Sequence, residues 1–183
     1  MLTIKVEEQE FYDSKKEVFF KTKARTVRLE HSLISIAKWE SHWEKPYLGT
    51  PGKVTGIQGI VEERYYLQCM IIGDVPDYIP ELLQQNHAQE IKTYIGARRS
   101  ATNVYRKGAS PPSRQIVTTE LIYYWMIRFN IPIECQRWHF NRLLMLIDVC
   151  NVKEQAATKK GGKMSSIESA NYRHQLNKAR QGG

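Results

Sequence analysis

The amino-acid sequence predicts an α+β fold, in which a small N-terminal antiparallel sheet precedes a mainly helical domain with a C-terminal helical hairpin and a flexible basic tail. Short segments rich in β-branched and aromatic residues occupy the first 35 positions. Apolar residues then recur at helical spacing as far as residue 150. The remaining stretch is polar, basic and poor in apolar side chains. We therefore expect a single domain over 1–150, β-rich over 1–35 and mainly helical over 36–150, followed by a flexible tail over 151–183.

The N-terminal sheet is predicted from three segments, LTIKV, EVFFKT and TVRLEH. The polar run Asp13-Ser14-Lys15-Lys16 separates the first two and is typical of a turn, which favours antiparallel pairing. The next segment, SLISIAKWESHW, fits both a strand that leads into a helix and a helix throughout. We assign a strand to about Ser35 and a helix after it.

Two loops are expected to interrupt the helices in the middle of the chain. Proline and glycine mark the first loop, between Lys45 and Gly59. The segments IVEERYYLQCMII and VPDYIPELLQQNHAQEIKTYIGA follow with helical spacing, and Gly73 and Gly96 are expected near their ends. The second loop, RRSATNVYRKGASPPSRQ, carries two prolines and four of its basic side chains within 98–107, so we expect it to be exposed.

The strongest structural signal is the pair of segments between Thr118 and Cys150. Thr118 can cap the first helix, and its LIYYWMI run is apolar on all sides, which predicts a central helix buried on most sides. Pro132 prevents continuation and fits the first turn of a second helix, so a tight hairpin is expected. The core stripe of the second helix consists of Phe140, Leu143, Leu144 and Ile147.

Cys135 and His139 are four residues apart, a spacing that would suit a nucleophile beside its base or two metal ligands. A structural zinc site needs four ligands, however, and the other cysteines, Cys69 and Cys150, stand alone in the sequence. None of the common phosphate-loop, hydrolase, metalloprotease or dinucleotide motifs occurs. We therefore expect no catalytic residues, no metal and no cofactor. The pair is interpreted as a buried thiol beside a partly buried, hydrogen-bonded histidine.

The carboxylates on the helices and the distribution of positive charge along the chain do not indicate a catalytic site. Glu40, Glu44 and the pair Glu62-Glu63 are interpreted as solvated faces of amphipathic helices. The net charge is +8, and residues 151–183 contribute +5 of it, from seven Lys or Arg and two Glu. A short helix over 165–180 could form in this tail on contact with a partner.

The expected location is cytoplasmic, without membrane contact. No apolar run approaches the roughly 20 residues needed to cross a bilayer. The start, MLTIKVEEQEF, is acidic where a secretory signal would be basic. Three widely spaced cysteines are typical of reduced thiols.

Two long stretches and a short C-terminal motif, in this order, resemble a known family. They are LEHSLISIAKWESHWEKPYL (Leu29 to Leu48), TTELIYYWMIRFNIPIECQRWHFNRLLMLIDVC (Thr118 to Cys150) and LNKAR. They resemble the small tail-module proteins of long, non-contractile-tailed phages (siphophages) that are known as tail assembly chaperones. The resemblance implies a non-enzymatic factor in the host cell cytoplasm that binds the tape-measure protein, keeps it soluble and helps the tail-tube protein to polymerise around it. The loops over 49–59 and 105–114 depart from the family pattern.

Two sets of residues are expected to bind the tape-measure protein. Trp39, Trp43 and Tyr47 would supply apolar contact, although at least one of the tryptophans is expected to pack in the core. Basic residues of the tail would bind acidic segments of the partner. They are Lys159, Lys160, Lys163, Arg173, Lys178 and Arg180. The sequence also leaves self-association of the chain as an open alternative.

Two alternatives also remain. One is a nucleic-acid-binding protein that acts through the basic tail and loop, and the other is a virion component at the head-to-tail joint.

Overall fold

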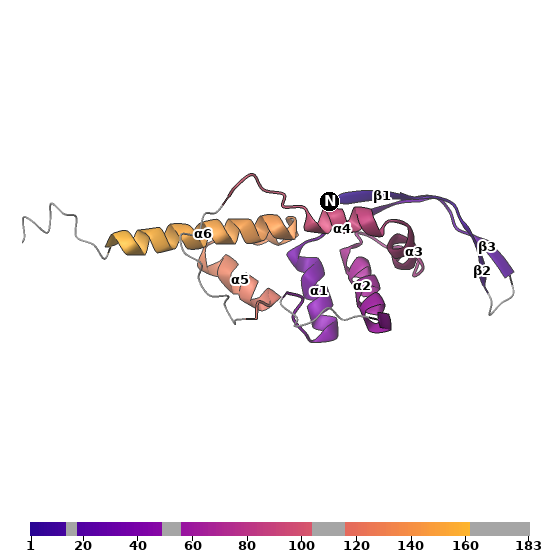
Figure 1. Ribbon diagram of the computed structural model, residues 1–183, viewed down its shortest axis with the longest axis horizontal. Coiled ribbons are helices and arrows are strands. Elements are labelled where there is room, and N and C mark those ends of the chain that lie inside the picture. Colours follow the sequence, from indigo (N-terminus) through magenta and orange to yellow (C-terminus); the bar gives the residue numbers. More distant parts are fainter. Residues whose placement is uncertain (14–17, 49–55, 104–115, 162–183) are drawn as a thin grey trace, which may run out of the picture.

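The α+β class is confirmed by a computed structural model, which describes residues 1–13, 18–48, 56–103 and 116–161. Most of the described residues are helical. Figure 1 shows the helices gathered around the middle of the molecule, with the strands projecting from one end and the last helix from the other. The elements are β1 (Leu2–Val6), β2 (Glu10–Asp13), β3 (Val18–Lys21), β4 (Arg25–Leu29), α1 (Leu33–Trp43), α2 (Gly56–Met70), α3 (Ile79–Asn86), α4 (Ala88–Gly96), α5 (Thr119–Arg128), the 3-10 helix η1 (Ile133–Arg137) and α6 (Phe140–Gly161).

The strands form a long two-stranded antiparallel ribbon. β1 pairs with β4, and β2 continues the ribbon by pairing with β3 in the same register. Between the two paired stretches the Thr22 N–H donates to the Gln9 carbonyl at 2.8 Å. At the base of the ribbon one face is buried and the other is exposed, as the two-residue period of a strand requires. The buried residues are Ile4, Val6, Val27 and Leu29.

The core lies between the base of this ribbon and the helices. α1 packs against α2, and α2 packs against α3. Just after α2, the chain pairs with the end of the ribbon, where the Glu30 N–H donates to the Met70 carbonyl at 2.8 Å and the Ile72 N–H donates to Arg28 at 2.9 Å. The largest fully buried helical side chains include Leu33, Ile36, Met70, Ile79, Leu83, Ile122, Met126, Phe140, Leu143 and Ile147.

The predicted strand to Ser35 is wrong, because α1 already begins at Leu33. The side chain of Ser35 belongs to the helix start. Its hydroxyl accepts from the Ser32 N–H at 2.9 Å and donates to the Ser32 carbonyl at 2.8 Å. Serine hydroxyls that bond to nearby backbone favour helix starts over strands.

The prediction that α5 is a central helix is also wrong. Its buried residues are Thr119, Ile122 and Met126, which form one stripe. α5 lies at the edge of the body, where it packs against α1 and contacts η1 through the hydrogen bond of Tyr123 to Gln136. Outside the stripe, Tyr123 and Trp125 are half-buried against the core, whereas Tyr124 and Ile127 are exposed.

The link between α5 and α6 is longer than the tight turn that was expected. Asn130 adopts a positive φ of 52° and so ends α5, as predicted. Pro132 then precedes the 3-10 helix η1, and α6 starts only at Phe140. The predicted core stripe of α6 is confirmed at Phe140, Leu143 and Ile147, which are buried, while Leu144 is half-buried.

The last helix runs past the predicted start of the tail. α6 has 22 residues and reaches Gly161, so residues 151–161 are helical. Lys, Glu, Gln and Ala, which follow Cys150 in the sequence, are good helix formers and explain the extension. The stretch 162–183, with the helix predicted over 165–180, lies outside the described residues.

Candidate partner-binding surface

Cys135 and His139 are placed as a buried thiol and a hydrogen-bonded histidine, which confirms the structural interpretation of this pair. Burial raises the pKa of the Cys135 thiol. His139 Nε2 lies 2.9 Å from the Tyr94 carbonyl, and burial lowers its pKa. η1 ends at Arg137, so the two residues do not share a continuous helix. A raised pKa disfavours the nucleophilic thiolate, and a lowered pKa makes the imidazole a weaker base.

The histidine belongs to a buried aromatic cluster in the centre of the molecule. Its ring lies edge-on to His31, with ring centroids 5.1 Å apart. His31 Nδ1 is hydrogen-bonded to the Tyr66 hydroxyl, and its backbone N–H donates to the Tyr94 hydroxyl at 3.3 Å. Burial, with a smaller contribution from His139, lowers the pKa of His31 to about 3. This cluster joins α2 and α4 to the segments that follow β4 and precede α6, so we assign it to the core.

Trp39 is a core residue, only 5% exposed, and cannot be part of an exposed contact patch. Its Nε1 donates to the Glu62 carbonyl at 3.2 Å. The Tyr47 ring packs edge-on against the Trp39 ring, with the ring centroids 5.3 Å apart, and at a tilt against the Tyr66 ring, with the centroids 4.7 Å apart. Burial raises the pKa of Tyr47 to about 12. Trp43 is half-buried. The expectation that at least one tryptophan serves the core is confirmed.

A salt bridge covers the aromatic residues. Lys45 Nζ pairs with Glu62 and lies 5.4 Å from the ring centroids of both Trp39 and Trp43. Burial raises the pKa of Glu62, but hydrogen bonds from Lys45 and Gln58 outweigh it and hold the pKa below its usual value. The aromatic set that was expected to bind a partner is therefore largely an internal cluster.

Glu40 is a second buried carboxylate, so the expectation of a solvated face is wrong for both Glu40 and Glu62. One oxygen of Glu40 accepts from the Tyr47 N–H at 2.7 Å. The other accepts from the Thr119 N–H at 2.8 Å and the Thr119 hydroxyl at 2.6 Å. Thr118 occupies the N-cap position of α5 but makes no side-chain cap bond. Glu40 supplies that acceptor from α1 and so anchors α5 to the body.

The outer face of α5 is the candidate surface that sequence reasoning missed. Tyr124 is 54% exposed and Ile127 is 75% exposed. The two residues are three positions apart and hence neighbours on the helix, with Glu120 and Arg128 exposed beside them. The signal was present in LIYYWMI, because a helix that is apolar on all sides is covered either by its own chain or by a partner.

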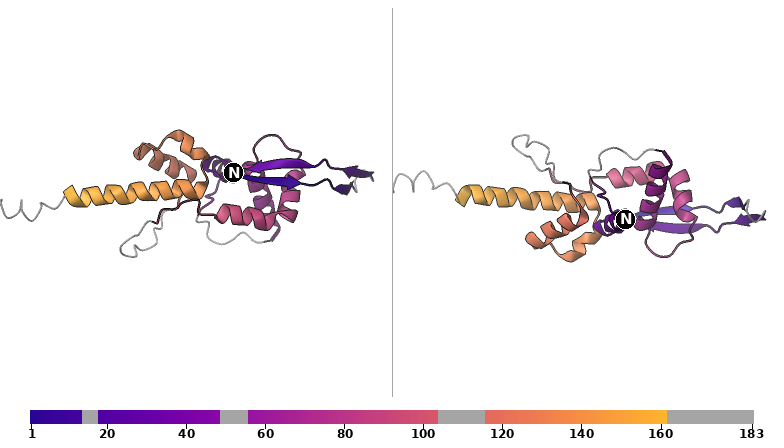
Figure 2. Two further views of the ribbon diagram at one scale, coloured as in Figure 1. Left: turned by 90° about the horizontal axis from the view of Figure 1, so that it is seen from above. Right: turned by 90° about the horizontal axis from the view of Figure 1, so that it is seen from below.

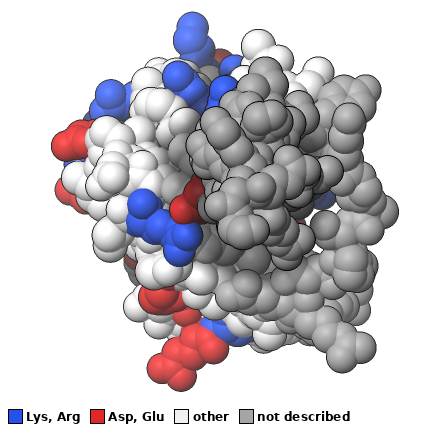
Figure 3. Space-filling view, turned by 90° about the vertical axis from the view of Figure 1, so that its left-hand side faces the viewer, with Lys and Arg blue, Asp and Glu red and all other residues white. Residues whose placement is uncertain are grey.

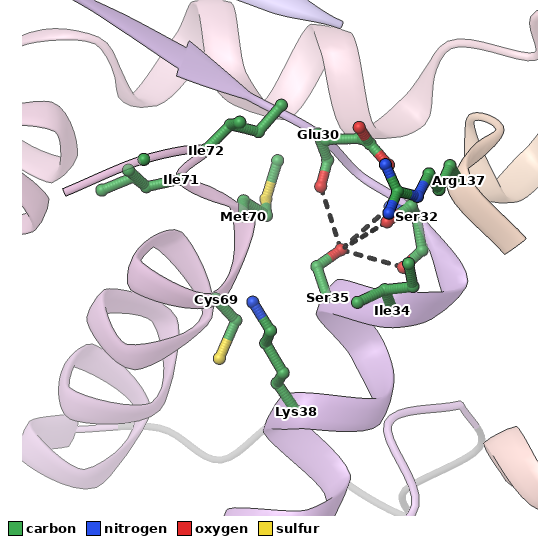
Figure 4. Close-up of a pocket in the computed structure, with 11 residues that line it drawn as sticks. Glu30, Ser32, Ile34, Ser35, Lys38, Cys69, Met70, Ile71, Ile72 and Arg137 are labelled. Carbon is green, nitrogen blue, oxygen red and sulfur yellow. Dashed lines mark hydrogen bonds between the residues drawn. The ribbon is translucent and has the colours of Figure 1, made fainter.

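A recess on another side of the body offers a different contact. Its volume is about 250 Å³, and it is bounded by α1, η1 and the ends of β4 and α2. Figure 4 shows Lys38 and Arg137 beside it, together with Ile34 and Ile72. Glu30 also lines the recess and lies beside Arg137 in Figure 4, so two basic side chains and one acidic side chain face this space. Within the described residues neither Lys38 nor Arg137 forms an ion pair, and the basic side chains outnumber the acidic one. Cys69 also lines it, and burial raises the pKa of that thiol to about 11.

The predicted basic contacts lie outside the described side chains. Lys159 and Lys160 belong to α6, but their side chains are outside the described part, as are Lys163, Arg173, Lys178 and Arg180. Seen from the end where α6 projects, the described surface carries basic and acidic side chains close together (Figure 3). Such a mixed surface does not form the basic stripe that is typical of nucleic-acid binding.

No family model, curated protein or solved structure was found to match this chain. In the described ranges no helix is long and apolar enough to cross a membrane. Over the same residues, no group of three or more His, Cys, Asp or Glu side chains is placed to hold a metal ion.

Proposed function

We propose that this chain is a non-catalytic assembly factor that binds the tape-measure protein of a long-tailed phage in the host cell cytoplasm, keeps it soluble and assists assembly of the tail tube. The observation that carries the proposal is the outer face of α5. Tyr124 and Ile127 expose large apolar side chains between charged neighbours. An apolar surface with a polar rim suits an amphipathic helix of a partner.

The resemblance supplies the identity of that partner. A tape-measure protein is a long helical chain that aggregates unless its apolar faces are covered. The outer face of α5 could cover such a helix, and the recess beside Lys38 and Arg137 could take an acidic side chain. Electrostatic contacts would then fix the register of the complex, while apolar burial would supply its affinity.

The test is co-expression with the tape-measure protein, followed by size-exclusion chromatography at low and moderate salt. The wild-type chain should yield a soluble complex that persists at the higher salt. Replacing Tyr124 and Ile127 together by serine should weaken the complex by roughly 100-fold or more, because each buried side chain contributes about 1.5–3 kcal/mol.

A matched control removes the same kind of side chain elsewhere. Ile57 and Ile60 are 83% and 50% exposed on α2, and their double replacement by serine should leave the complex intact. If both double variants bind alike, the outer face of α5 is not the contact surface. An insoluble tape-measure protein beside a chain that elutes alone, or with nucleic acid that salt removes, would overturn the proposed function and favour the nucleic-acid alternative.

A further inference from the structure

α6 carries a second apolar stripe that the fold covers only in part. The core stripe is formed by Phe140, Leu143 and Ile147, all buried. A second set follows the spacing 4, 3, 4 along the same helix. It consists of Met145, Val149, Val152 and Ala156, the first two half-buried and the last two exposed. At about 100° per residue, this second stripe lies on the side of α6 opposite to the core stripe.

The position of α6 leaves this stripe accessible along much of the helix. In Figures 1 and 2 the C-terminal half of α6 extends away from the body in every view. The side chains of residues 152–157 are all exposed. α5 is held on the other side of α6, where Arg128 pairs with Glu154 at 2.8 Å. Binding through the second stripe would therefore leave the outer face of α5 free.

The spacing of the stripe identifies the kind of contact. Apolar residues that alternate at intervals of four and three form the seam of a coiled coil, in which two helices pack with knobs into holes. A helix that projects into solvent gains little stability from propensity alone, so packing along such a seam would also stabilise the extension.

The flanking charges identify the occupant. With Val149 and Val152 as seam positions, Asp148 and Lys153 stand on opposite sides of the stripe, five residues apart. About 140° of helix rotation separates them, so they face away from each other within one helix. In a parallel two-stranded coil, a residue in the position of Asp148 faces the residue five places further along the other strand.

We propose that the second stripe binds the same stripe of a second copy, so that two α6 helices run parallel about a two-fold axis. Asp148 of each copy then faces Lys153 of its partner copy, and the pairing is reciprocal, as an isologous contact requires. The two sides of the stripe are therefore complementary in charge to those of a second copy. This dimer is independent of the partner proposed above, because it uses the side of α6 that faces away from α5, whereas the partner contacts the outer face of α5.

The first test measures the mass of the full chain by sedimentation equilibrium over a wide concentration range. The weight-average mass should rise from 21.4 kDa toward twice that value. Replacing Val149 and Val152 together by aspartate should keep the chain monomeric, with the far-UV circular dichroism of the folded wild type. A monomer at all concentrations in the wild type, or a dimer that tolerates both aspartates, would overturn the proposal.

Charge exchange tests the pairing itself. Asp148→Lys and Lys153→Asp, made singly, should each weaken dimerisation by about tenfold, because each places like charges opposite one another twice per dimer. The double variant should restore the wild-type affinity. Lys92→Asp, an exposed site on α4, is the matched control and should have no effect. Failure of the double variant to recover would refute the parallel pairing.

A cysteine at the seam tests the orientation. Ala156 occupies a seam position, so in a parallel dimer the two copies of this residue face each other. Ala156→Cys, in a chain whose native Cys150 is replaced by serine, should form a disulfide-linked dimer in oxidised glutathione. An antiparallel arrangement would hold the two cysteines apart, and a chain that stays uncrosslinked under these conditions would overturn the parallel arrangement.

Discussion

Replacing Glu40 by alanine should release α5 from the body of the protein. The carboxylate accepts three hydrogen bonds, from the Tyr47 N–H at 2.7 Å and from the N–H and hydroxyl of Thr119 at 2.8 and 2.6 Å. A hydrogen bond to a charged group contributes about 1.5–3 kcal/mol, and the three are not additive because the freed donors regain water in part. We expect the free energy of unfolding to fall by about 3–5 kcal/mol, a large share of the roughly 5–15 kcal/mol typical of a domain.

The assay is urea denaturation at pH 7, followed by far-UV circular dichroism and by tryptophan fluorescence. Glu40→Gln keeps one acceptor oxygen but loses the charge, so it should cost about 1.5–3 kcal/mol. Glu44→Gln removes the same charge from the exposed C-cap residue of α1, four residues further along the chain, and should stay within about 0.5 kcal/mol of the wild type. A loss below about 1 kcal/mol in Glu40→Ala would refute the anchoring role.

Three further predictions concern the core and the surface. Below pH 6.5 the unfolded chain protonates His31, whereas the folded chain resists protonation down to the lowered pKa of about 3. The free energy of unfolding should therefore fall by about 2 kcal/mol between pH 6.5 and pH 5. Urea denaturation at the two pH values measures this loss, which should be smaller in His31→Gln. Leu83→Ala should cost about 2–5 kcal/mol in the same assay, because Leu83 is fully buried in α3, and a cost below about 1 kcal/mol would contradict its core position. Arg128→Ala should cost at most about 1 kcal/mol, since its ion pair with Glu154 is exposed, and a larger loss would show that this pair holds α6 in place.

The α+β class, the presence of antiparallel N-terminal strands and the core stripe of α6 could be predicted because periodicity reports which residues share a face. The expected pairing of LTIKV with EVFFKT is wrong, because β1 pairs with β4 and β3 pairs with β2. What periodicity cannot report is whether that face is covered. LIYYWMI is apolar on all sides, and a buried central helix and an edge helix with an uncovered face give the same pattern. The structure distinguishes them, because Ile122 and Met126 are buried while Tyr124 and Ile127 are exposed.

The candidate site was harder to predict for a similar reason. Glu40 lies in α1 and Glu44, with the same side-chain chemistry, is the C-cap residue of that helix, yet Glu40 is buried and Glu44 is exposed. The difference arises from Thr119, which lies 79 residues further along the chain and donates to Glu40. No local pattern reports so distant a partner, so a remote cap of this kind follows only from the tertiary structure.

The N-terminal ribbon sets up a gradient of local stability within a single hairpin. At its base, Ile4 and Leu29 are buried in the core, and the backbone pairs again with residues 70–72. Further out, β2 and β3 pair with each other beyond the helices in all views. A two-stranded ribbon without a packed face is only marginally stable in water. Amide protons should therefore exchange fastest in the outer pairs and slowest near Leu29, so the outer ribbon can reshape against another surface while its attachment stays rigid.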